Sequence, residues 1–186
     1  MKKNKKSLQN NGTLSYTQQL KQDRKVKEFW KSMGVSPDEE GFQAYVRHVK
    51  FRSGDVSDEE LEMLTDKIKM IDMLDIYEAP ITATGISHLT KTQFIKELRL
   101  KYCTEITNDS IPLLNQIKGL ELLYLGGTQV TVDAIHGLKD LNTLKSLFLS
   151  SDLEYEEAKT ILIPMRDVLP GCEFIIDHKV IYFDEE

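Results

Sequence analysis

A repeat of 24 to 25 residues constrains the fold of this chain more than any other feature. Three apolar residues, spaced three and then two positions apart, recur five times at steps of 25, 24, 25 and 24 residues. The triplets are Val46/Val49/Phe51, Ile71/Leu74/Ile76, Ile95/Leu98/Leu100, Leu120/Leu123/Leu125 and Leu144/Leu147/Leu149. A fixed period in this range is typical of stacked repeats, in which each unit buries its apolar side chains against its neighbours.

The residues after each triplet indicate a tight bend and a short helix. Three positions on come small or backbone-bonding residues: Gly54, Ala79, Cys103, Thr128 and Asp152. A hydroxyl residue that can cap the first amides of a helix follows in four units: Ser57, Thr82, Thr107 and Thr131. Apolar pairs three residues apart then fit one helix face: Leu61/Leu64, Ile86/Leu89, Ile111/Leu114 and Ile135/Leu138. We interpret each unit as a strand, a bend and a returning helix, which makes the strands parallel.

This organisation is that of leucine-rich-repeat (LRR) proteins. We predict an α/β fold: a right-handed LRR solenoid, with a curved parallel sheet lined by helices, over residues 46–153. Residues 1–15 are expected to form a disordered polar and basic tail, residues 16–45 an N-terminal helical cap, and residues 154–186 a C-terminal cap of helix and strand.

Individual residues refine the prediction for the two caps. Trp30 is expected to anchor the N-terminal cap on the end of the repeats. Pro164 should split the closing helix between Tyr155 and Leu169. The apolar runs from Glu173 to Phe183 predict a sixth strand followed by a turn.

Two segments resemble known LRR proteins. The sequence from Leu98 to Ile111, with Cys103 at the bend, resembles the cysteine-containing LRR subtype of F-box LRR proteins and of the mitochondrial ATP synthase coupling factor B (subunit s) family. The last repeat, from Leu144 to Leu153, and the segment from Leu169 to Phe174 are similar to the closing part of the coupling factor B family. The resemblance implies a non-catalytic adaptor or assembly factor.

Composition narrows the class of partner and the location. The net charge of -6 and the isoelectric point near 5.3 argue against nucleic acid as the main ligand. Two distant cysteines indicate neither a disulfide framework nor a zinc site, so no metal or cofactor is expected. The basic start is followed by polar residues, and no apolar run is long enough for a membrane span. We therefore expect a cytoplasmic protein without membrane insertion, monomeric when unbound.

A binding surface is predicted on the concave face of the sheet, because strand side chains alternate between its two faces. Arg99, Tyr124 and Phe148 are expected to carry the binding, with Tyr77 and Leu122 in support. The remaining predicted contacts are His48, Lys50, Asp75 and Glu97, with Glu78 and Tyr102 at the rim. An alternative is that Tyr124 and Phe148 are covered by the C-terminal segment or pack only on each other.

No residue pattern indicates catalysis. The four histidines fall in different repeats, and Gly126-Gly127 lacks the lysine of a phosphate loop. We predict a non-enzymatic protein-binding module, either an adaptor or an assembly factor. The alternative is an immunity or inhibitor protein that occludes a toxin or enzyme, since an acidic protein attracts basic targets. An enzyme is the remote alternative.

Overall fold

The computed structural model describes residues 15–36, 42 and 44–183, and the chain divides into two compact units, Met1–Phe42 and Gln43–Glu186. The first unit contains helix α1 (Tyr16–Ser32). Ser15 and Gln18 begin this helix with a capping box, in which each side chain accepts from the other residue's backbone N–H. The rings of Phe29 and Trp30 pack edge to face, with centroids 5.0 Å apart. The predicted tail lies outside the described residues except for Ser15, and the anchoring role of Trp30 stays a prediction.

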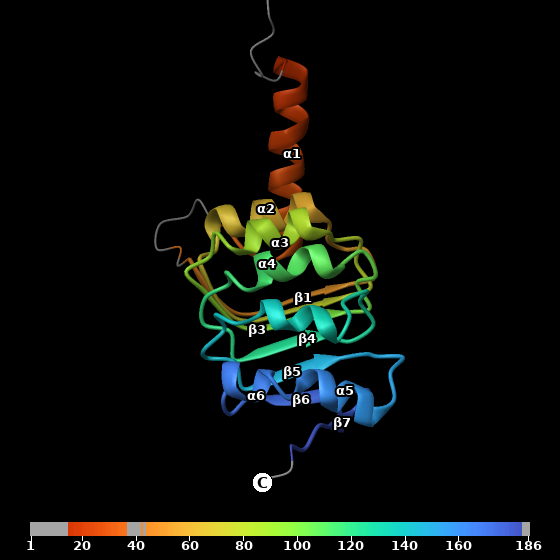
Figure 1. Ribbon diagram of the computed structural model, residues 1–186. Helices are drawn as coiled ribbons and strands as arrows, with labels where there is room; N and C mark the ends of the chain where they lie inside the picture. Colours follow the sequence, from red (N-terminus) through yellow and green to blue (C-terminus); the bar gives the residue numbers. More distant parts are fainter. Residues whose placement is uncertain (1–14, 37–41, 43, 184–186) are drawn as a thin grey trace, which may run out of the picture. The chain divides into compact units, whose positions relative to one another are not determined.

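The second unit is a mixed α/β structure around one seven-stranded sheet (Figure 1). The strands are β1 (Tyr45–Arg52), β2 (Met70–Tyr77), β3 (Phe94–Lys101), β4 (Leu122–Leu125), β5 (Ser146–Leu149), β6 (Glu173–Ile176) and β7 (Lys179–Val180). Each strand pairs with the next along the chain; β1 to β6 are parallel and β7 is antiparallel. The expected parallel sheet is therefore confirmed.

The repeat determines the register of the sheet. Val49 pairs with Leu74, Leu74 with Leu98, Leu98 with Leu123, and Leu123 with Leu147. The central members of the five triplets thus form one buried row across the sheet. Because each step conserves both the pairing and the side-chain direction, the apolar residues of successive units form one continuous core.

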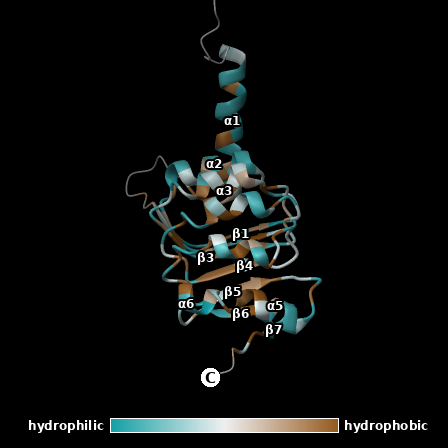
Figure 2. Cartoon of the chain, in the orientation of Figure 1, coloured by the Kyte–Doolittle hydropathy of each residue, from teal (hydrophilic) through white to brown (hydrophobic). Residues whose placement is uncertain are grey.

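Short helices lie along one face of this sheet (Figure 1). They are α2 (Asp58–Lys67), α3 (Ala83–Leu89), the 3₁₀ helix η1 (Asn108–Ser110) with α4 (Ile111–Leu114), and the 3₁₀ helix η2 (Asp133–Gly137). The strands are mainly hydrophobic, whereas hydrophilic residues are spread along the helices (Figure 2). This distribution is what elements need when one side is buried and the other faces water.

Three of the four predicted capping residues precede helices as expected. The backbone and hydroxyl of Ser57 donate to Glu60, and the hydroxyls of Thr82 and Thr107 accept from backbone amides. The prediction for Thr131 is wrong, because Val132 occupies the cap of η2 and the backbone amide of Thr131 donates to Oδ1 of Asn108 instead.

The C-terminal part of the second unit follows the sequence closely. The closing helix is split into α5 (Tyr155–Leu162) and α6 (Met165–Val168), with Pro164 at the break. Strand β6 is the expected sixth strand, and Phe174 on it packs in the core. The hydroxyl of Tyr155 accepts from the backbone amide of Tyr182, which fixes the segment after β7.

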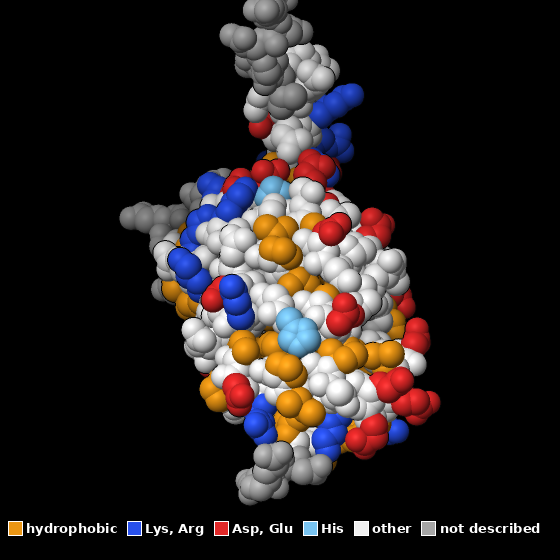
Figure 3. Space-filling model, viewed as in Figure 1, with side chains coloured by type: hydrophobic (Ala, Val, Ile, Leu, Met, Phe, Trp, Pro, Cys, Tyr) orange, Lys and Arg blue, Asp and Glu red, His pale blue; other side chains and the backbone are white. Residues whose placement is uncertain are grey.

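Charges are unevenly distributed over the second unit. On its helix-bearing side, Lys and Arg gather along one flank and Asp and Glu along the other (Figure 3). Local charge is therefore a better guide to a partner than the net value of -6. Within the part of the chain that the structure describes, no helix has the length and apolar character needed to cross a bilayer.

Candidate functional site

The candidate site is the sheet face that points away from the helices, called here the distal face. Residues that alternate with the buried triplet members form rows across it. The three rows of paired residues are His48/Met73/Glu97/Leu122/Ser146, Lys50/Asp75/Arg99/Tyr124/Phe148 and Arg52/Tyr77/Lys101. The nine contacts predicted on the strands all lie in these rows, and the two predicted rim residues, Glu78 and Tyr102, follow directly after β2 and β3. Strand β6 extends the first two rows with Glu173 and Ile175. Whether they bind a protein stays a prediction.

An aromatic stack occupies the distal face at β4 and β5. The rings of Tyr124 and Phe148 lie 5.2 Å apart between centroids with an angle of 22° between their planes. Both side chains are half-buried, more covered than the sequence suggested, because each ring covers the other. Burial raises the pKa of Tyr124, and the neighbouring Tyr102 adds to the effect. The tyrosine is therefore neutral at physiological pH and presents an uncharged ring.

Asp75 departs most from the expectation for this face. The sequence placed it among surface contacts, but the residue is only 4% exposed. Its Oδ2 accepts from Nη2 of Arg52 at 2.9 Å, and its Oδ1 lies 3.4 Å from Nζ of Lys101. Burial raises the pKa of Asp75, but the hydrogen bond from Arg52 and the charges of Lys101 and Arg52 outweigh burial and leave that pKa below its usual value. Asp75 is therefore an ionised hub that organises the cations around it.

Replacement of Asp75 should make the free energy of unfolding less sensitive to acidic pH. Because the folded pKa of Asp75 lies below the unfolded value near 3.8, its ionised form stabilises the fold above that pH and loses this effect as the pH falls through the folded pKa. Asp75→Asn should cost about 1–3 kcal/mol at pH 7. The difference from wild type should shrink as the pH falls below about 4.

Urea unfolding at pH 7 and at lower pH tests this expectation. Asp66→Asn is a suitable control because Asp66 is an exposed carboxylate on α2. A stability gap for Asp75→Asn that stays constant from pH 7 to pH 3 would show that the fold does not lower the pKa of Asp75.

The other charged residues of the face differ in whether they form ion pairs within the chain. Nη2 of Arg99 donates to Oε2 of Glu97 at 2.6 Å, and its buried Nε has no hydrogen-bond acceptor among the described residues. His48 and Lys50 on β1 are exposed, and neither has an ion-pair partner in the described part of the chain. Their polar ends can reach a ligand without breaking an existing bond.

Tyr102 is one of the two rim residues expected from the sequence, which did not predict its backbone conformation or its contact with Tyr77. It is 52% exposed and its backbone has φ of 55°, a left-handed conformation that is uncommon for a bulky residue. Its ring packs edge to face on Tyr77, with centroids 5.6 Å apart, and the guanidinium of Arg52 lies 5.9 Å from the Tyr77 centroid. The only sequence signal was its position directly before the bend residue Cys103.

Two glycines make room for these aromatic rings. A Cβ atom on Gly126 would lie 2.6 Å from Cε1 of Tyr124, and one on Gly127 would lie 2.4 Å from Cδ1 of Tyr102. Gly127 also has φ of 74°, which favours glycine. The glycine pair therefore lets rings of the same and the preceding repeat pack closely.

Gly126→Ala should displace the Tyr124 ring from the stack. Gly126 itself has no positive φ, so the backbone tolerates alanine and the clash falls on the ring. We expect a stability loss of about 1 kcal/mol and an altered aromatic signal in near-ultraviolet circular dichroism. Gly54→Ala is the comparison for glycine replacement: an added Cβ there meets nothing within 4 Å but φ of 86° adds backbone strain, so this variant should lose stability without a change in the aromatic spectrum. An aromatic spectrum unchanged by Gly126→Ala would contradict the proposed contact.

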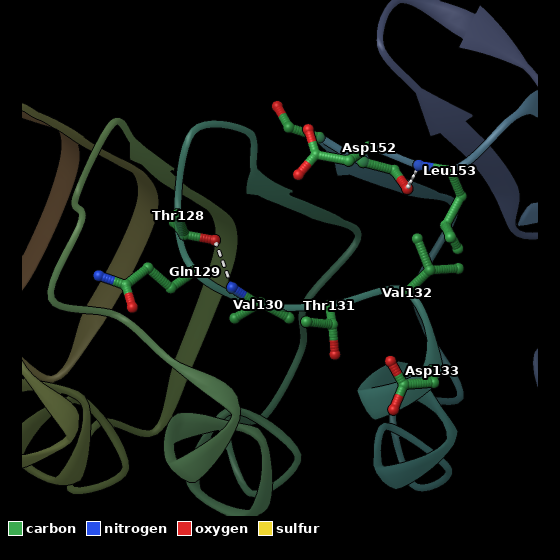
Figure 4. A pocket seen from close by; sticks show the side chains of 10 residues that line it. Thr128, Gln129, Val130, Thr131, Val132, Asp133, Asp152 and Leu153 are labelled. Atoms are coloured by element: carbon green, nitrogen blue, oxygen red, sulfur yellow. Dashed lines mark hydrogen bonds between the residues drawn. The ribbon is translucent and has the colours of Figure 1, made fainter.

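A groove of about 490 Å³ opens between the fourth and fifth repeats (Figure 4). It is lined by Thr128 to Asp133 and by Ser150 to Leu153. The bends of the third and fourth repeats are held together by pairing of Thr107 with Gln129. The hydroxyl of Thr128 accepts from the amide of Val130 (Figure 4). The hydroxyl of Ser151 accepts from the amide of Leu153, and that of Ser150 accepts from the amide of Gly127 in the preceding repeat. These bonds stabilise the two bends and supply no reactive pair.

The titratable groups of the described residues form neither a metal-binding cluster nor an activated thiol. Among the described residues, no group of three or more His, Cys, Asp or Glu side chains is arranged to hold a metal ion. Cys103 and Cys172 are both free thiols, and burial raises the pKa of each, for Cys172 to about 12. Both thiols are therefore protonated and weakly nucleophilic at neutral pH.

Comparison with known proteins gives two distant relatives. The chain is 29% identical over 119 residues to the mitochondrial ATP synthase subunit s of Bos taurus, and 26% identical over 119 residues to that of Homo sapiens. Each match covers 61% of this chain and 59% of the relative's own length. No protein-family profile matches the sequence.

These relatives contradict the expected cytoplasmic location. Both are named as mitochondrial proteins, which points to mitochondria instead. The expectation was based on the residues of the N-terminal segment. The repeat, the core and the distal face carry no information about compartment, so the rest of the chain could not correct it.

Proposed function

We propose that the chain is a non-enzymatic accessory or assembly protein that binds a protein partner on its distal face. The stack of Tyr124 on Phe148, with Nζ of Lys101 5.6 Å from the Tyr124 centroid, carries this proposal. Large rings beside cations, only half-covered by their own chain, are the composition of a protein-binding hot spot.

The finer architecture is part of the same proposal. A pairing step of 24 to 25 residues between β1 and β5, with a bend and a short helix in each unit, supports an LRR solenoid over residues 46–153. In such a solenoid the distal face is the concave side. Residues 16–45 and 154–186 then close the two ends as caps.

ATP synthase is the first candidate partner, because both relatives are named as its subunits. An accessory role in mitochondria agrees with that name. The inhibitor alternative, in which the chain occludes a toxin or enzyme, gains no support from the relatives.

Co-purification tests both parts of the proposal. The tagged chain, expressed in its own host, should enrich ATP synthase subunits in quantitative mass spectrometry, and Tyr124→Ala/Phe148→Ala should remove that enrichment. Tyr182→Ala is the control, since Tyr182 is 70% exposed and lies outside the distal rows. Enrichment that survives the double substitution would assign binding to another surface. If ATP synthase is not enriched but the double substitution removes the enrichment of another protein, only ATP synthase is rejected as the partner and the distal face stands as the binding site.

A further inference from the structure

We infer that the distal face selects an acidic partner segment, whose carboxylates bind the cations of β1 to β3 and whose large apolar side chain packs on Tyr124 and Phe148. This inference rests on the proposed function and specifies its partner. It is contrary to what the net charge of the chain suggests, since a protein with charge -6 would be expected to attract basic partners.

The charges on the first three strands are the first argument. The distal rows of β1, β2 and β3 hold four cations, Lys50, Arg52, Arg99 and Lys101, and two carboxylates, Asp75 and Glu97. These rows therefore have an excess of two positive charges within three neighbouring strands, and Glu78, exposed at the rim beside Tyr77, lowers the excess over these strands and their rim to one. Charges beyond about 8–10 Å are largely screened at physiological salt, so this local excess outweighs acidic groups on the other side of the sheet.

The engagement of these cations is the second argument. Arg52 and Lys101 share one carboxylate, that of Asp75, and Asp75 is too buried for a partner to displace it easily. The side chain of Arg52 is nevertheless 48% exposed and that of Lys101 27% exposed. Lys50 is exposed and has no ion-pair partner in the described part of the chain. The buried aspartate thus holds two cations in place while leaving donors on both free for a second carboxylate.

The position of Lys101 joins the basic and aromatic parts into one site. Its Nζ lies 3.4 Å from Asp75 and 5.6 Å from the centroid of the Tyr124 ring. The second row then continues through Phe148 to Ile175 without another charge. A partner segment that crosses the strands therefore places its acidic part over β1 to β3 and its apolar part over β4 and β5. This arrangement determines the orientation of the segment on the face.

The strand spacing sets the length of the segment. From β1 to β5 the chain makes four steps of about 4.8 Å, or roughly 19 Å. An extended segment spans this distance with about six residues and a helical one with about thirteen. A peptide of 16 residues therefore covers the site in either conformation.

Selection from a random library of phage-displayed 16-residue peptides tests the inference without knowledge of the natural partner. The full chain is immobilised, and the composition of the selected peptides is compared with the unselected library. We expect at least a twofold enrichment in Asp and Glu, combined with an aromatic or large aliphatic residue. One selected peptide is then synthesised with a fluorophore, and its affinity is measured by fluorescence polarisation.

Two variants and one control test whether the cations of the distal face bind the peptide. Lys50→Glu should weaken binding of the peptide about threefold to tenfold. The neutral variant Arg52→Gln/Asp75→Asn/Lys101→Gln should weaken it tenfold or more; it removes the buried carboxylate together with its cations, so no buried charge is left unpaired. Lys118→Glu makes the same charge change at an exposed lysine that lies outside the distal rows, and should leave affinity within twofold.

Each outcome decides the inference. Selected peptides without acidic enrichment that still lose binding in Phe148→Ala would overturn the acidic partner and leave the proposed binding face intact. Peptides indifferent to both the cation variants and Phe148→Ala would overturn both. A library that yields no selected peptides overturns the inference as well. Self-association in sedimentation velocity that Lys50→Glu abolishes would instead assign the face to a second copy of the chain.

Discussion

Leu98→Ala and Leu123→Ala should each lower the free energy of unfolding by about 2–5 kcal/mol. Both side chains are completely buried and pair with each other across β3 and β4. Removing three carbon atoms from either leaves a cavity between two stacked units, which cannot collapse without moving a whole strand. Urea unfolding followed by circular dichroism measures the loss.

The matched control for this experiment is Leu153→Ala. Leu153 is 41% exposed at the groove after β5, so the same truncation should cost less than about 1 kcal/mol. Equal costs at Leu98 and Leu153 would mean that the central triplet residues are not the core of the sheet. A change in the denaturant slope for Leu98→Ala would indicate instead that the repeats no longer unfold together.

The core was predictable because five repeats with the same apolar spacing all indicate which side chains of each strand point inward. The pairing of Leu74 with Leu98 and of Leu98 with Leu123 follows from a step of 24 or 25 residues alone. Helix positions followed from the same register, since a hydroxyl residue lies at a fixed distance after the strand. Thr131 shows the limit of this reasoning: the preceding repeat supplies Asn108, whose side-chain oxygen accepts from the amide of Thr131, and η2 begins later.

The sequence predicted which residues lie on the distal face but not how far each of them is buried. Alternation along the strands places Asp75 and Tyr124 on this face, and pairing puts them in one row. Alternation contains no information on how long side chains fold over their neighbours. Arg52 and Lys101 bend toward Asp75 and bury it, and the rings of Tyr124 and Phe148 cover each other. These contacts depend on rotamers and on the glycines nearby, neither of which has a periodic signal.

Tyr124→Ala and Phe148→Ala should each weaken binding of the natural partner by about 2 kcal/mol or more, which is roughly thirtyfold in the dissociation constant. Each ring is half-buried in the free chain and stacked on the other, so its outer surface is preorganised for a partner and loses little side-chain entropy on binding. The same stack means that neither substitution is free of structural cost. We expect each to lower stability by about 0.5–1.5 kcal/mol, the range measured for aromatic pairs.

Measurement of melting temperature and partner affinity on the same variants separates these two effects. Binding to the partner obtained by co-purification should fall while the chain stays folded at the assay temperature. Double substitution should weaken binding by less than the sum of the single effects, because each ring holds the other in position. Unfolding of both single variants would place the rings in the core. Stable ring variants with unchanged affinity would exclude the Tyr124–Phe148 stack from the partner's site, and unchanged affinity of Lys50→Glu as well would exclude the distal face.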